Sequence, residues 1–131
     1  MQKIRLILAL ATTIFFLAAL IHLEVIWVGY PDQAAAVAES VIGTVLLLGL
    51  LMTLAWPERT RSVALVVQAF GLLGTIVGLT LLLSVGPMTG LDLVIHLVMA
   101  VVLLIGLNVA FRTSSPTVVA DSEKSVAASH K

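Results

Sequence analysis

Four long apolar runs make up most of this chain, and each is long enough to cross a lipid bilayer. A membrane-spanning helix needs about 20 predominantly apolar residues. Backbone groups in lipid must be satisfied internally, so only helices or a closed barrel can span, and 131 residues are too few to close a barrel from so many apolar residues. The sequence therefore predicts an all-α, membrane-embedded fold with spans at residues 4–28, 34–56, 62–85 and 91–111.

Residues that break helices separate these runs. Gly and Pro fall at 29–31, at 57 and at 86–90, between one apolar run and the next. Because such short connections keep consecutive helices adjacent and antiparallel, the expected architecture is an up-down-up-down four-helix bundle. We expect residues 1–112 to form this one membrane domain, and the small, polar, unpatterned residues 113–131 to form a disordered cytoplasmic tail.

The basic residues set the expected orientation. Those outside the tail all fall at the same end of the predicted bundle: Lys3, Arg5, Arg59, Arg61 and Arg112. The other two connections contain no Lys or Arg, so the positive-inside rule places both termini in the cytoplasm. The first apolar run is longer than the roughly 7–15 residues of a signal-peptide core, and we expect it to be retained as a span. The sequence thus predicts a multi-pass protein of the cytoplasmic (inner) membrane.

Composition excludes several classes of function. Hydrophobic residues make up 60% of the chain and charged residues 11%, and the formal net charge is zero, so no basic surface indicates nucleic acid. The chain has no cysteine, which excludes disulfides, thiolate metal sites and thiol catalysis. No Ser-His-Asp order, phosphate loop or dinucleotide fingerprint occurs, so support for an enzyme is weak. The expected partners are the lipid bilayer and either further copies of the chain or a larger membrane complex.

Ionisable residues inside the predicted spans are the candidate functional residues, because charge in hydrocarbon is costly and usually functional. At about 1.5 Å per residue, His22 and His96 lie at similar depths, roughly 10 Å and roughly 9 Å from the outer ends of their spans. Asp92 precedes His96 by one helical turn, so its carboxylate is expected to fix the tautomer of that imidazole. Glu24 and Glu39 also fall on the outer side.

Three interpretations of this cluster stay open. In the first, His22 and His96 hold a cofactor such as haem, or join Glu24, Glu39 and Asp92 as ligands of a divalent metal. In the second, the cluster is the binding site of a small proton- or cation-coupled transporter. In the third, the same side chains only hydrogen-bond between helices and set their register. No spaced metal motif such as H-E-x-x-H or E-x-x-H is present to decide between them.

Three glycines lie in the third apolar run, Gly71, Gly74 and Gly78, and the last two have a G-x-x-x-G spacing. Small residues at this spacing let two membrane helices approach closely. We expect these glycines to pack helices within one bundle, with a homodimer face as the alternative.

A short sequence resemblance points to the same architecture. Residues 18–23, Ala-Ala-Leu-Ile-His-Leu, followed by Tyr30, resemble the first helix of small, uncharacterised bacterial four-helix membrane proteins. In that family a histidine followed by an apolar residue stands near the outer end of the first span, and the third span often bears glycines, as residues 71–78 do here. The resemblance implies a four-helix membrane bundle and no particular activity.

The function expected from the sequence is that of a small structural or accessory subunit, or of a self-associating bundle. The alternative is a protein that uses the outer cluster to bind haem or a divalent metal, or to act as a small proton- or cation-coupled transporter.

Overall fold

The computed structural model describes residues 1–29, 31–85 and 89–113, so the predicted tail at 113–131 lies outside the described residues apart from its first position. No strand occurs in this described part, which confirms the all-α prediction. Four of the helices are long and apolar enough to cross a membrane. The helices are α1 (Gln2–His22), α2 (Gln33–Ala55), the short 3-10 helix η1 (Pro57–Arg59), α3 (Thr60–Val85) and α4 (Gly90–Arg112).

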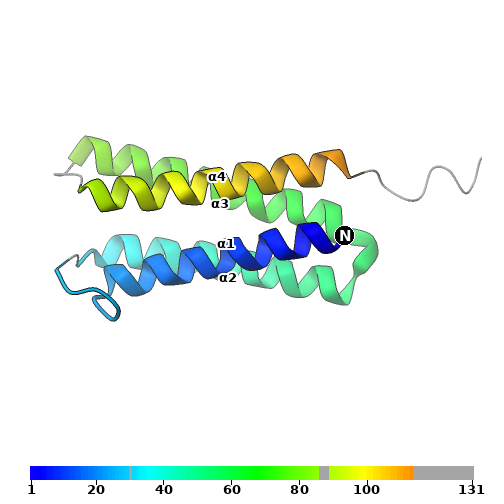
Figure 1. Cartoon of the computed structure of the whole chain (residues 1–131), viewed down its shortest axis with the longest axis horizontal. Coiled ribbons are helices and arrows are strands. Elements are labelled where there is room, and N and C mark those ends of the chain that lie inside the picture. The colour runs from blue at the N-terminus through cyan, green and yellow to red at the C-terminus, as the bar shows by residue number, and fades with distance from the viewer. Residues whose placement is uncertain (30, 86–88, 114–131) are drawn as a thin grey trace, which may run out of the picture.

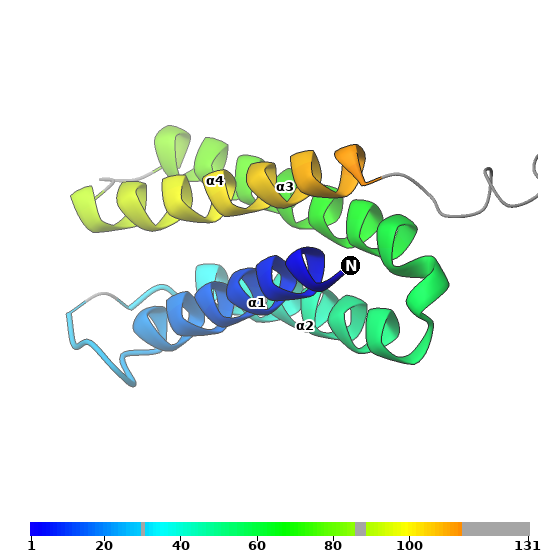
Figure 2. The same cartoon turned by 45° about the vertical axis from the view of Figure 1, so that its right-hand side comes forward.

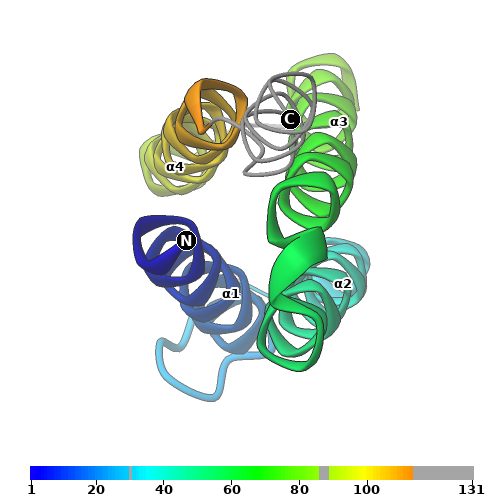
Figure 3. The ribbon, with the colours of Figure 1, turned by 90° about the vertical axis from the view of Figure 1, so that its right-hand side faces the viewer.

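Consecutive long helices run in opposite directions and lie side by side, α1 with α2 and α3 with α4 (Figures 1 and 2). Seen from one end, α1 neighbours both α2 and α4, and α3 completes the bundle (Figure 3). The N-terminus, η1 and the last turn of α4 lie at one end of the bundle (Figure 1). We call this the basic end, because it carries Lys3, Arg5, Arg59, Arg61 and Arg112. The opposite end, which carries Glu24, Asp32, Glu39 and Asp92, is called the acidic end.

Helix α1 is shorter than the span predicted for it. It ends at His22, whereas the sequence predicts a span as far as residue 28. Glu24 takes a left-handed backbone conformation with φ of 56°, which ends the helix, and its carboxylate accepts a hydrogen bond of 2.7 Å from the backbone N–H of Gly29. The backbone N–H of Asp32 returns to the carbonyl of His22 at 3.1 Å. Glu24 therefore belongs to a turn at the acidic end and not to a membrane-spanning helix.

Side chains at the acidic end also fix where α2 and α4 begin. The carboxylate of Asp32 accepts a hydrogen bond from the backbone N–H of Ala35 at 2.9 Å, which satisfies one of the free donors at the start of α2. Thr89 and Asp92 form a reciprocal capping box at the start of α4, each side chain bonding to the backbone N–H of the other. These caps hold two acidic side chains at defined positions.

At the basic end, two arginines bond to the last turns of neighbouring helices. Arg5 of α1 donates to the carbonyl of Thr53 in α2, and Nε of Arg61 in α3 donates to the carbonyl of Ala110 in α4 at 3.2 Å. Cations at the C-terminal ends of helices are favourable because they face the negative end of the helix dipole. Each of these contacts ties together two neighbouring helices.

Apolar side chains fill the centre of the bundle and also cover its outside. Ile4, Leu8, Phe15, Leu46 and Leu103 are almost completely buried and belong to one continuous core. Large apolar side chains are exposed along every long helix, among them Leu6, Val41, Leu73 and Val101. An apolar surface of this extent is unfavourable in water but suits contact with lipid chains.

The predicted glycine stripe of α3 faces the inside of the bundle. A Cβ added at Gly71 would lie 3.3 Å from Leu103, and one at Gly74 would lie 2.6 Å from Ile42. At Gly78 the nearest atom would be Nε2 of His96, at 3.4 Å. Because these neighbours belong to α2 and α4 of the same chain, the close approach occurs within the bundle.

Candidate functional site

Three buried or partly buried ionisable side chains from three helices meet at the acidic end. Nδ1 of His22 in α1 lies 2.9 Å from Oε2 of Glu39 in α2, and Nε2 lies 3.3 Å from Oδ1 of Asp92 in α4. His22 and Glu39 are each only 4% exposed. Both ring nitrogens face a carboxylate oxygen, and only the imidazolium form of histidine can donate from both. We call these three residues the triad.

Asp92 serves two roles at once, because its two oxygens have different partners. Oδ2 accepts from the backbone N–H of Thr89 at 3.3 Å and also from the Thr89 hydroxyl, while Oδ1 faces His22. The helix cap thus sets the direction of the carboxylate that meets the imidazole. Sequence reasoning missed this second role, although the pattern Thr89-x-x-Asp92 before an apolar run is a recognisable capping signal.

His96 is bound differently from the way the sequence predicts. Its Nδ1 donates to the backbone carbonyl of Asp92 at 2.8 Å, while the Asp92 side chain faces His22 instead. The expected contact between the Asp92 carboxylate and the His96 ring is therefore replaced by one to the backbone, because the carboxylate is already held by Thr89 and His22. With Nδ1 as the donor, Nε2 of His96 is left as an acceptor.

The structure brings together only part of the predicted site. His22, Glu39 and Asp92 form the triad, His96 lies one helical turn beyond Asp92, and Glu24 lies apart in the turn after α1. Within residues 1–29, 31–85 and 89–113, no group of three or more His, Asp or Glu side chains is arranged to hold a metal ion. Both ring nitrogens of His22 face carboxylate oxygens.

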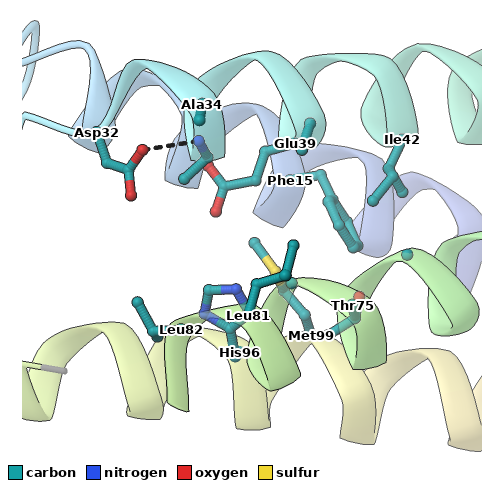
Figure 4. Close-up of a pocket in the computed structure, with 14 residues that line it drawn as sticks. Phe15, Asp32, Ala34, Glu39, Ile42, Thr75, Leu81, Leu82, His96 and Met99 are labelled. Atoms are coloured by element: carbon teal, nitrogen blue, oxygen red, sulfur yellow. Dashed lines mark hydrogen bonds between the residues drawn. The ribbon is translucent and has the colours of Figure 1, made fainter. Parts of the chain in front are cut away.

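A cavity of about 470 Å³ lies beside the triad, mainly between α2 and α3 (Figure 4). Small residues line much of it: Ala34, Ala35 and Ala38 of α2, and Gly74 and Gly78 of α3. Phe15 of α1 and Met99 of α4 also contribute to its walls. The cavity was not predicted, although an alanine-rich start of one span opposite a glycine-bearing end of the next is visible in the sequence.

Glu39 and His96 are among the polar side chains that line this mostly apolar space. Glu39 reaches in from α2, and His96 lies across the space on α4 (Figure 4). Oε1 of Glu39 is buried and has no hydrogen-bond partner among the described residues, whereas Oε2 is bound to His22. The Glu39 carboxylate therefore has one oxygen in the triad and one without a partner. A mostly apolar cavity with a few polar groups is the usual form of a small-molecule site.

Comparison with known proteins adds no family to this description. No protein-family model, no curated protein and no solved structure matches the chain.

Proposed function

We propose that this chain is a multi-pass protein of the cytoplasmic membrane that binds a small, mostly apolar molecule in the cavity between α2 and α3. The cavity is the observation that carries the proposal. Its volume, about 470 Å³, falls in the range of roughly 300–1,000 Å³ that is typical of small-molecule sites. It favours a ligand-binding role over that of a purely structural or accessory subunit.

The place of the cavity on the molecule indicates how a ligand would reach it. Ala34, Ala38 and Leu81 line the cavity and are also exposed on the outer surface of α2 and α3. In a bilayer this surface would face lipid, because the neighbouring exposed side chains are apolar. A ligand that partitions into the membrane would enter sideways between the two helices.

Ligand binding can be tested with a reporter inside the cavity. The chain has no cysteine, so Ala35→Cys supplies a unique thiol for a trifluoroethyl tag. We expect propylbenzene to shift the fluorine NMR signal of this tag saturably, in protein purified in mild detergent. Adding Ala38→Phe, which fills the cavity rim, should abolish the shift.

Two matched variants separate a site from general partitioning into detergent. Leu51→Cys places the same tag on an exposed position of α2 outside the cavity, and Ala55→Phe repeats the blocking substitution at an exposed position of that helix. The proposal fails if the Leu51→Cys tag responds with the same concentration dependence, or if Ala55→Phe blocks the shift as well as Ala38→Phe.

The proposed orientation places the basic end in the cytoplasm, since the positive-inside rule assigns clustered Lys and Arg to that side. Val28→Cys lies in the exposed turn at the acidic end, and Glu58→Cys lies in η1 at the basic end. In right-side-out vesicles we expect a membrane-impermeant maleimide to label Val28→Cys and not Glu58→Cys. Inside-out vesicles should give the reverse, and any other pattern contradicts this orientation.

A further inference from the structure

The unpartnered oxygen of Glu39 indicates what kind of ligand the cavity takes. Glu39 is 4% exposed, and its Oε1 has no partner in the described chain. Buried polar atoms are almost always hydrogen-bonded, and a buried acceptor without a donor is costly. A ligand that donates a hydrogen bond to this oxygen would remove that cost.

Acidic side chains outnumber basic ones around the cavity. In the triad two carboxylates, Glu39 and Asp92, face one histidine ring, so a protonated His22 can balance only one of two ionised carboxylates. Asp32 adds a further carboxylate at the exposed start of α2 and also lines the cavity. Among the described residues that line the cavity there is no Lys or Arg. The local charge therefore favours a cation.

The polar side chains that line the described cavity offer acceptors and no spare donor. Nδ1 of His96 already donates to the carbonyl of Asp92, which leaves Nε2 as an acceptor beside Gly78. The hydroxyl of Thr75 donates to the carbonyl of Gly71 at 2.9 Å. A ligand that brings its own donors is complementary to such a wall, whereas an anion is not.

From these contacts we propose that the ligand is an organic amine: an apolar body carrying an ammonium group that donates to Oε1 of Glu39, with Nε2 of His96 as a second acceptor. This inference rests on the proposed function of the cavity. It adds that the charge of Glu39 makes the cavity prefer an amine over uncharged molecules of equal size. An ammonium group has three donors, which is enough to supply one to each of these acceptors.

The test compares three probes of nearly equal size, 2-phenylethylamine, 2-phenylethanol and propylbenzene, on the full chain with the fluorine tag at Ala35→Cys. We expect the amine to bind most tightly. We expect the ratio of its affinity to that of propylbenzene to fall at least about tenfold in Glu39→Gln, because a hydrogen bond to a charged group is lost. Partitioning into detergent is the same for both proteins and cancels in this comparison. His96→Leu should lower the ratio in the same direction by a smaller factor.

Glu24→Gln is the matched control, because it removes an equal charge at the acidic end but outside the cavity, and it should leave the ratio unchanged. If propylbenzene binds but the amine shows no advantage over it or over the alcohol, the amine inference is overturned while the proposed binding function stands. If no probe shifts the tag, the proposed function itself fails. Should Glu39→Gln not fold, the ranking of amine over alcohol in the otherwise unaltered chain still decides.

Discussion

Replacing Gly106 by Ala is expected to destabilise the bundle by about 1–3 kcal/mol, the usual result of forcing extra volume into a packed core. A Cβ at this position would lie 1.5 Å from Oε1 of Gln68 and 2.9 Å from Cγ2 of Ile7. Gln68 is 0% exposed, and its Nε2 donates to the carbonyl of Ala64 at 3.1 Å. A Cβ here would therefore displace the buried Gln68 amide and crowd Ile7.

The measurement is the free energy of unfolding, from SDS titration in mixed micelles. Gly90→Ala makes the same substitution on the same helix, where a Cβ would meet nothing within 4 Å, and should change stability little. Combining Gly106→Ala with Gln68→Ala should recover part of the loss, because the clashing amide is gone. Equal unfolding midpoints for Gly106→Ala and Gly90→Ala would show that α3 and α4 are not packed as closely as described.

The helices could be predicted from the sequence because long apolar runs indicate a lipid environment, and lipid favours helical backbone. Apolar runs of spanning length leave no alternative to helices when their backbone must satisfy itself. The end of α1 could not be found in the same way, because residues 23–28 are as apolar as a helix interior apart from Glu24. The left-handed conformation of Glu24 and its bond to Gly29 depend on how the turn closes onto α2.

The structure brings part of the predicted site together, through contacts that the sequence did not predict. Counting residues from the outer turns brought His22, Glu39 and Asp92 to one end of the bundle, where they meet. Which of their faces point inward depends on the rotation of each helix about its axis, and that is set by packing of α1 against α2 and α4. Sequence spacing alone therefore paired Asp92 with His96, one turn away, while the fold turns the carboxylate towards His22.

The cavity depends on a relation between two helices, which no single run of sequence contains. Alanines at the start of α2 are compatible with tight packing as well as with an open space. The space is lined from the other side by Gly74 and Gly78 of α3. At the other end of the same helix pair, Val67 fills the corresponding position against Gly49, where an added Cβ would meet it at 2.7 Å.

Removing the imidazole of the triad is expected to have the largest effect of any single substitution. His22→Leu leaves the carboxylates of Glu39 and Asp92 without their shared cation, and Glu39 has almost no access to water. Removing one partner of a buried ion pair costs about 3–5 kcal/mol, because the remaining charge is not compensated. We expect a loss of stability in this range, measured by the same SDS titration.

His96→Leu is the matched control. It removes a buried histidine from the same end of the bundle. Among the described residues that ring bonds only to a backbone carbonyl, so a loss of about 1 kcal/mol is expected. The difference between the two variants isolates the effect of the carboxylates from that of losing a buried ring.

A double-mutant cycle then assigns the cost to the contact with Glu39. In a Glu39→Gln background the buried carboxylate is neutral, so His22→Leu should destabilise by less than it does alone, with an interaction energy of about 0.5–3 kcal/mol. Additive losses would mean that His22 and Glu39 do not stabilise each other as charges, although they lie 2.9 Å apart. We expect Glu39→Gln to lose both the stability that the triad contributes and the preference of the cavity for an amine. No variant that leaves this carboxylate intact and ionised should lose both.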